Sequence, residues 1–228
     1  MQKVIKAIIF DLDGVIIDSN PEIEKFWHRW AKKTKRQLTR QNITEHIHGR
    51  KGVETLAALF NDIDDKTKEA IIKDAVEFDS QMNPEPIKGI YHFIQTLLQL
   101  KIPVGLVTSS HEKRALLMLQ KQNLHNSFEA HVTAEEVTNG KPHPEPYLTI
   151  AKKLNQHPAY CLVFEDAISG VLSAKAAGME VIGVNTEEAA QSLLNYGAAC
   201  IISSFEELRV EQNILLGKNG ISYTLQAP

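Results

Sequence analysis

The stretch Val4–Gly14, VIKAIIFDLDG, decides the fold. Its first seven residues are mostly apolar and rich in β-branched side chains, which is typical of a buried strand. The strand runs directly into Asp11, Leu12 and Asp13. Two carboxylates beside a buried strand need a compensating cation, and oxygen ligands suit Mg²⁺. Taken alone, the pattern also fits a strand-end turn with solvated aspartates, because Asp and Gly are common turn residues.

Residues 18–84 have a different character. Apolar and aromatic residues recur at helical spacing after Pro21, and further helical patterns cover Val53–Phe60 and Lys66–Phe78. This region contains no convincing strand pattern, and Asn83–Pro86 then breaks the chain. We therefore expect an all-helical domain inserted after the first strand.

Strand and helix patterns alternate after this break. The expected strands are Pro103–Thr108, Ala130–Thr133, Tyr160–Phe164, Glu180–Val184 and Ala199–Ile202, and the expected helices are Ile90–Leu100, His111–Gln122, Pro146–Leu154 and Ile168–Ala177. This alternation predicts an α/β fold, a Rossmann-like doubly wound and mostly parallel sheet covered by helices. Asn219-Gly220 predicts a small C-terminal β-ribbon. The expected domains are a core of residues 1–17 and 85–228 and a helical cap of residues 18–84.

Composition and charge exclude several functional classes. The chain has 228 residues, 43% of them hydrophobic, and a formal net charge of −3, so it lacks the basic excess of a nucleic-acid surface. No apolar stretch approaches the roughly 20 residues of a membrane span, and Asp11 ends the first apolar run too early for a signal peptide. Cys161 and Cys200 form no paired motif, which favours small buried hydrophobes in a reducing compartment. We expect a cytoplasmic monomer without nucleic-acid or membrane partners.

Three further polar loops follow expected strands. Thr108–Ser110 offers hydroxyl and backbone N–H groups that can hold phosphate oxygens, although such residues also commonly cap helices. Two prolines stiffen the loop that carries Lys141, whose ammonium can neutralise a carboxylate and a phosphoryl group together; a lone lysine is usually a solvated charge. Glu165-Asp166 opens a helix, where acidic caps are common. Because ligands bind beyond the carboxyl ends of strands in such sheets, the four loops can converge on one site.

The order of these motifs carries a resemblance to a known family. DLDG at 11–14, VTSS at 107–110, GKPHP at 140–144 and FEDAISG at 164–170 together resemble the haloacid dehalogenase superfamily over nearly the whole chain, and the insert resembles its first-type cap. Within it, Ile47–Arg50 and Val163–Ala167 resemble the sugar phosphatases related to 2-deoxyglucose-6-phosphate and glycerol-3-phosphate phosphatases. The resemblance implies a Mg²⁺-dependent phosphatase that hydrolyses small phosphorylated sugars or polyols through an aspartyl-phosphate.

The resemblance also implies a role for each motif residue. Asp11 is the nucleophile, and Asp13 protonates the leaving alkoxide and then activates water. Lys141 balances the negative charge of Asp11 and phosphate. Three residues of the first two loops hold the phosphoryl group: Leu12, Thr108 and Ser109.

The resemblance likewise implies a metal site and a specificity loop. The metal ligands are the Asp11 carboxylate, the Asp13 carbonyl and Asp166, with Glu165 acting directly or through water. Discrimination between substrates would come from the cap, where the most suggestive segment is His48, Gly49, Arg50 and Lys51. The same four residues also fit a positively charged helix-start loop that faces solvent.

Four alternatives to this function can be compared with the motif residues. Dehalogenases lack the second aspartate of the first motif, which is present here as Asp13. A β-phosphoglucomutase would carry a histidine where Ile23 stands and an arginine where Gly52 stands, although Arg50 or Lys51 can substitute for that arginine. Another small phosphate, such as phosphoglycolate, also remains open as the substrate. A non-catalytic module on the same fold would predict the loss of a motif residue, and none is lost.

Overall fold

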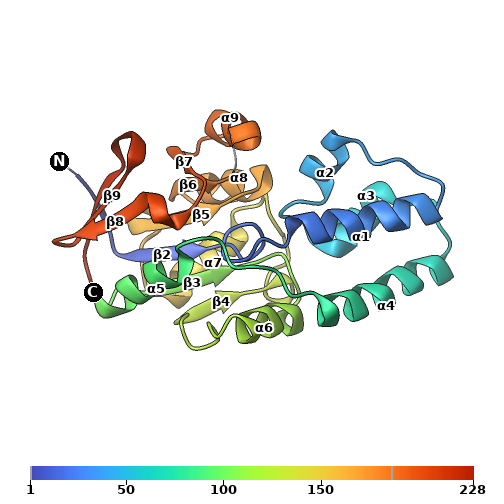
Figure 1. Ribbon diagram of the computed structural model, residues 1–228, viewed down its shortest axis with the longest axis horizontal. Coiled ribbons are helices and arrows are strands. Elements are labelled where there is room, and N and C mark those ends of the chain that lie inside the picture. The colour runs from blue at the N-terminus through green and yellow to red at the C-terminus, as the bar shows by residue number, and fades with distance from the viewer. Residues whose placement is uncertain (1, 186) are drawn as a thin grey trace.

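The computed structural model describes residues 2–185 and 187–228 and has a parallel sheet at its centre (Figure 1). Six strands lie in the order β4-β3-β2-β5-β6-β7, and each neighbouring pair is parallel. The strands are β2 (Ala7–Phe10), β3 (Val104–Val107), β4 (Ala130–Val132), β5 (Cys161–Glu165), β6 (Glu180–Val184) and β7 (Cys200–Ile202). The chain winds outward from β2 to β4 and then returns to β5 on the other side of β2. The expected doubly wound sheet is confirmed, and its strand order reverses at β2, where such sheets bind ligands.

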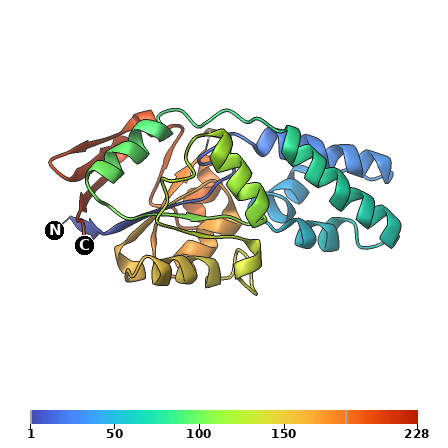
Figure 2. The same ribbon diagram turned by 90° about the horizontal axis from the view of Figure 1, so that it is seen from below.

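Helices cover both faces of this sheet. α5 (Ile90–Gln99) and α6 (Glu112–Lys121) lie on one face, and α7 (Glu145–Lys153), α8 (Ile168–Ala176) and α9 (Glu187–Asn195) lie on the other; Figure 2 shows α5 and α6 opposite α7. Alternate residues of β2 serve the two faces, because Ile8 and Phe10 belong to one hydrophobic core and Ala7 and Ile9 to the other.

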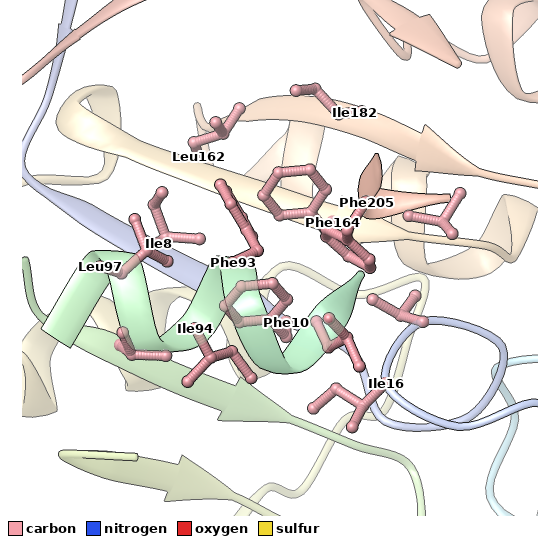
Figure 3. Packing of buried hydrophobic residues seen from close by; sticks show 14 of the residues in the cluster. Ile8, Phe10, Ile16, Phe93, Ile94, Leu97, Leu162, Phe164, Ile182 and Phe205 are labelled. Atoms are coloured by element: carbon pink, nitrogen blue, oxygen red, sulfur yellow. The ribbon is translucent and has the colours of Figure 1, made fainter. Parts of the chain in front are cut away.

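Aromatic packing holds the carboxyl end of β2 in place. The rings of Phe10 and Phe164 stack with centroids 5.3 Å apart, and Phe93 and Phe205 close the cluster from α5 and the C-terminal region (Figure 3). Phe10 directly precedes Asp11, and Phe164 directly precedes Glu165. The fully buried rings therefore fix the backbone from which two acidic side chains project.

Helices α1 to α4 form a separate group beyond the sheet (Figure 1). They are α1 (Asn20–Lys33), α2 (Arg40–His46), α3 (Gly52–Leu59) and α4 (Asp65–Gln81), and they pack around a hydrophobic cluster of their own that includes Phe26, Trp27, Trp30 and Phe60. The two chain segments that connect this group to the sheet lie side by side, because Asp18 N donates to Glu85 O at 2.8 Å. The helices expected after Pro21 and over the two later segments are confirmed, whereas α2, with one buried residue, has too little periodicity to be seen in the sequence.

The prediction of one strand over Val4–Phe10 is wrong. The chain divides at Lys6 into β1 (Lys3–Ile5) and β2, because Ile5 O accepts from Gln226 N at 2.9 Å while Lys6 N donates to Tyr160 O at 2.8 Å. β1 joins a second sheet in the order β1-β10-β9-β8. Its other strands are β8 (Leu208–Glu211), β9 (Ile214–Gly217) and β10 (Ser222–Leu225). The expected C-terminal ribbon is confirmed as the antiparallel pair β9–β10.

The remaining elements are short or were not expected. Within the described residues, 3₁₀ turns cover Ala134–Glu136, Pro158–Tyr160, Phe205–Glu207 and Lys218–Gly220. Neither α9 nor β8 was predicted from the sequence. Among the residues that the structure describes, no helix is both long and apolar enough to cross a bilayer.

Candidate active site

The four polar loops converge at the carboxyl end of the sheet. Asp11 follows β2, Thr108 follows β3 and Asp166 follows β5, and these three strands are neighbours. A cavity of about 410 Å³ lies between these loops and helices α1, α3 and α4, and Asp11, Asp13 and Thr108 line its floor. The structure therefore brings the predicted catalytic side chains together, which the order of the motifs only suggested.

Lys141 is the buried centre of the site. Its side chain is 1% exposed, and its Nζ lies 2.6 Å from Asp11 Oδ1 and 2.5 Å from Glu165 Oε1. Burial disfavours the ammonium, but the two carboxylates outweigh that cost and raise the pKa of Lys141 above its usual value. Desolvation by burial raises the pKa of Asp11 to about 7 despite the attraction of Lys141. Lys141 is thus a fixed cation beside the proposed nucleophile.

Both carboxylate oxygens of Glu165 accept hydrogen bonds that hold Lys141 and the start of the next loop in place. Its Oε1 accepts from Lys141 and, at 2.9 Å, from Tyr147 Oη; its Oε2 accepts from the backbone N–H groups of Asp166 at 2.9 Å and Ala167 at 3.0 Å. A Cβ on Gly170 would lie 1.7 Å from Oε1, so only glycine leaves room for the carboxylate. Tyr147 was not singled out in the sequence, because its partner Glu165 is 18 residues away.

Three buried carboxylates form a candidate metal centre. Oxygen atoms of Asp11, Glu165 and Asp166 all lie within 4.8 Å of one another. Burial, followed by the charges of Glu165 and Asp11, raises the pKa of Asp166 well above its usual value. Asn20 Nδ2 donates to Asp166 Oδ2 at 2.5 Å, from the start of α1. Because Lys141 offsets only part of this buried negative charge and all the donors are oxygens, the cluster fits Mg²⁺.

Asp13 is held by an arginine that the sequence analysis missed. Arg114 donates to both carboxylate oxygens of Asp13, at 2.8 and 2.7 Å, and Ser19 and Ser110 donate to the same carboxylate. Burial favours the neutral acid, but Arg114 outweighs it and lowers the pKa of Asp13. Arg114 lies four residues after Ser110 and donates to its hydroxyl at 2.7 Å. Helical spacing from the Thr108–Ser110 motif was the signal that could have identified it.

Comparison with known proteins places the chain in a family. Residues 8–184 match the haloacid dehalogenase-like hydrolases. The chain belongs to the haloacid dehalogenase-like hydrolase family. The expected superfamily is therefore confirmed.

Two curated relatives of this hydrolase are named as phosphatases. The phosphorylated carbohydrates phosphatase of Thermotoga maritima is 31% identical over 92% of the chain and all of that protein. Hexitol phosphatase A of Escherichia coli is 34% identical over 79% of the chain and 83% of that protein. Among solved structures, the β-phosphoglucomutase of Clostridium difficile is 25% identical with a TM-score of 0.74, covering 90% of this chain and 94% of the other.

The predicted specificity loop of this hydrolase docks on the core. Ser109 Oγ donates to Gly49 O at 2.8 Å, and Arg50 donates to the backbone O of Lys141 at 2.6 Å. Gly49 has a φ of 68°, and a Cβ there would lie 2.5 Å from Ser169 Oγ, so the close approach requires glycine. The loop therefore contacts the segments that carry the second, third and fourth motifs.

The four loop residues do not all face the cavity. His48, Gly49 and Arg50 line it. Lys51 does not, and its Nζ instead donates to Ala134 O and Val137 O at 2.8 and 2.9 Å. These residues do not form the solvent-facing loop considered as the alternative, since none of them is exposed and the loop is hydrogen-bonded to the core.

The side chain of Leu12 is wholly buried in the hydrophobic core, so only its backbone can contact a substrate.

The wall of the cavity that faces the core comes from apolar residues of α1 and α4, among them Ile23, Trp27, Ile72 and Val76. Trp27 packs in the cluster of the helical group and also lines the cavity.

Proposed function

We propose that this hydrolase is a magnesium-dependent phosphatase that cleaves small phosphorylated sugars or polyols through an aspartyl-phosphate. One observation carries the proposal: the carboxylate of Asp11 lies against a buried ammonium and beside an unbalanced acidic cluster, with Asp13 two residues further on. This combination supplies a nucleophile, a fixed positive charge, an oxygen-rich cation site and a proton donor. Phosphoryl transfer needs mainly this kind of positioning and charge neutralisation.

The residues suggest a two-step reaction. A carboxylate oxygen of Asp11 attacks phosphorus, and the bond from phosphorus to the ester oxygen breaks as Asp13 gives that oxygen a proton. Asp13 then takes a proton from water, whose oxygen attacks the aspartyl-phosphate and releases phosphate and Asp11. Lys141 balances the charge that accumulates on Asp11 and the phosphoryl oxygens, and Thr108 with the Ser109 backbone holds those oxygens.

Asp11, Asp166 and the backbone carbonyl of Asp13 would hold the Mg²⁺ ion. Glu165 would support the site through Lys141 and the backbone, because both of its oxygens already accept hydrogen bonds. When bound, the cation would neutralise negative charge on the phosphoryl group during transfer.

Residues 18–84 would act as a cap over a core formed by residues 1–17 and 85–228. The cavity lies between the two, and both connecting segments run side by side. A closed cap would exclude water before the aspartyl-phosphate forms. The ester group of the substrate would then lie against cap residues, and the core would recognise only the phosphoryl group.

The relatives and the cavity together favour a small sugar or polyol ester. The two curated relatives named above act, by their names, on phosphorylated carbohydrates and hexitol phosphates. The cavity, at about 410 Å³, is at the small end of ligand pockets. Apolar wall residues can pack against the C–H groups of a carbon chain, while His48 lies within the same cavity to meet hydroxyls.

A β-phosphoglucomutase is the second candidate, favoured by the solved structure named above. Such an enzyme must bind a second phosphate. Gly52 offers no cationic side chain, Lys51 is bound to core carbonyls, and Arg50 pairs with Glu54 at 2.9 Å. The phosphatase therefore remains the better-supported proposal.

Magnesium should stabilise the protein more strongly as pH rises. The pKa of Asp11 is raised from 3.8 to about 7, and that of Asp166 is raised too. The folded protein thus holds protons that the unfolded chain has released, so metal-free stability falls as pH rises from about 4 through 7. Magnesium at about 100 times its Kd should add roughly 2.7 kcal/mol, or about 5–10 °C in Tm, at pH 8, and less at pH 5. Thermal unfolding with magnesium or a chelator measures this. Asp166→Asn should abolish the shift, and an equal shift at both pH values would contradict the assignment.

Substrate ranking tests the proposed function directly. In a panel of phosphorylated sugars, polyols, nucleotides and phosphoglycolate, we expect a sugar or polyol phosphate to exceed nucleotides in kcat/KM by at least about tenfold. His48→Ala should lower kcat/KM for that best substrate more than for p-nitrophenyl phosphate. His46→Ala, which changes a residue outside the cavity, is the matched control. A leading nucleotide, or turnover only with a sugar bisphosphate present, would overturn this assignment.

A further inference from the structure

The cavity has a polar end and an apolar end. The core lines the polar end with Asp11, Asp13, Thr108 and Ser109, where the phosphoryl group would lie. The cap supplies the facing wall, which consists mainly of apolar side chains from α1, α3 and α4, among them Ile23, Trp27, Val53, Leu56, Ile72 and Val76. The part of the substrate beyond the ester oxygen would therefore lie against this wall.

Three polar side chains that the cap contributes to the cavity already have partners. Asn20 donates to Asp166 at 2.5 Å, and Thr55 donates to a backbone carbonyl at the end of α2 at 2.5 Å. Asp79, near the end of α4, accepts from Arg114 at 2.9 Å. Each of these side chains would have to give up a hydrogen bond to bind a hydroxyl of the substrate, which removes most of the gain.

Arg50 and His48 are the other polar side chains of the cap that line the cavity. Arg50 donates to the backbone O of Lys141 at 2.6 Å and pairs with Glu54 at 2.9 Å, so it is already bound as well. His48 Nε2 lies 2.9 Å from Glu24 Oε1, which leaves Nδ1 of the ring for one hydroxyl. These side chains can therefore match one hydroxyl of the substrate, and further hydroxyls would meet the apolar wall.

The apolar wall also has surface to cover. Val53 of α3 and Ile72 and Val76 of α4 are 55%, 52% and 57% exposed, and all three line the same cavity. A substrate that covers them with C–H or methyl groups removes apolar surface from water, which favours binding. A hydroxyl pressed against the same side chains loses its hydrogen bonds to water and finds no partner, which opposes binding.

We infer that the preferred substrate is the phosphate monoester of a sugar or polyol whose end remote from the phosphate is deoxygenated, with a methyl group in place of a hydroxymethyl group. The inference rests on the proposed phosphatase function and narrows its substrate class. The core binds the phosphoryl group, His48 meets one hydroxyl, and the apolar end packs against Val53, Ile72 and Val76. Contacts made so far from the reacting bond raise kcat/KM because they persist in the transition state.

Matched pairs of substrates test the inference on the wild-type protein. Sorbitol 6-phosphate is compared with 1-deoxysorbitol 6-phosphate, and ribitol 5-phosphate with 1-deoxyribitol 5-phosphate. The carbon that bears the phosphate and its neighbouring hydroxyl are the same within each pair, so the leaving alkoxide is equally reactive. We expect the deoxy ester to have the higher kcat/KM in each pair, by at least about tenfold. Equal values, or a preference for the fully hydroxylated esters, would overturn the inference.

Nearly isosteric substitutions connect this preference to the wall. Val53→Thr combined with Val76→Thr places two hydroxyls on the wall, and the helices should tolerate them because both positions are exposed and both residues are β-branched. The double variant should reduce the preference for the deoxy esters by at least about fivefold. Val210→Thr makes the same change on β8, outside the cavity, and should leave the preference as it is in the wild type. Thermal unfolding of each variant checks that the fold is retained.

The outcomes separate the inference from the proposed function. An unchanged preference in the double variant would show that the deoxygenated end does not lie against Val53 and Val76, and would overturn their role. Should the double variant fail to fold, Ile72→Ala still decides, because a shortened wall should lower kcat/KM for the deoxy esters more than for the hydroxylated ones. A wild-type protein that hydrolyses a nucleotide but none of the four esters would refute the proposed function, and the inference with it.

Discussion

Asp11→Asn should lower kcat by at least about 1,000-fold, equivalent to about 4 kcal/mol of transition-state stabilisation. Asparagine is nearly isosteric with aspartate but is a poor nucleophile, so no covalent bond to phosphorus can form. The fold should survive, since Lys141 keeps its contact with Glu165 at 2.5 Å and the substitution removes a carboxylate whose ionisation burial opposes. Steady-state kinetics on p-nitrophenyl phosphate and thermal unfolding measure the two effects.

The matched control for this substitution is Asp65→Asn, at a side chain that is 92% exposed on α4. Acid-quenched wild-type enzyme should carry phosphate on Asp11 in mass spectrometry after mixing with substrate, and the Asp11→Asn enzyme should carry none. Turnover within tenfold of wild type, or phosphate attached to another residue, would show that Asp11 is not the nucleophile.

Lys141→Met should destabilise the protein and inactivate it together. The ammonium is buried between Asp11 and Glu165, so its removal leaves buried carboxylates without their cation. Breaking a buried ion pair by removing one partner costs about 3–5 kcal/mol, and we expect a loss of unfolding free energy in that range. We also expect kcat to fall by about 100-fold or more, because a preorganised positive charge beside the phosphoryl group is lost. Urea unfolding in the presence of a chelator and initial rates with magnesium measure these losses.

A second substitution separates stability from catalysis at this lysine. Adding Glu165→Gln to Lys141→Met removes one of the stranded charges, so unfolding free energy should partly recover while activity stays low. Lys152→Met, at an exposed lysine of α7, is the control and should change neither quantity appreciably. A Lys141→Met protein as stable as wild type would mean that the carboxylates are balanced in another way.

Much of the fold follows from short-range patterns. The alternation of strands and helices after Asn83 predicted the parallel sheet, and helical periodicity predicted most of the inserted group. Both depend on which side chains near one another in sequence share a face, so they can be read from the chain. The continuity of Val4–Phe10 was predicted wrongly, because the division at Lys6 depends on Gln226 and Tyr160, which are distant in sequence.

The chemistry of the site divides in the same way. The family resemblance carried by the order of the motifs was enough to propose Asp11, Asp13, Lys141 and Asp166. The hydrogen bonds that Glu165 accepts from Lys141 and from two backbone N–H groups were not predicted. Neither was the apolar wall of the cavity, which forms only where α1 and α4 face the sheet.

Local composition and periods of two and 3.6 residues determined most of the elements, their order and the acidic, hydroxyl and lysine loops. The tertiary structure alone decided which polar groups, distant in sequence, pair with one another. Arg114 meets Asp13 across 101 positions, Asn20 meets Asp166 across 146, and Lys141 meets Asp11 across 130. No local pattern encodes such pairs, because buried charges are matched only where packing of the whole chain brings them within a few ångströms.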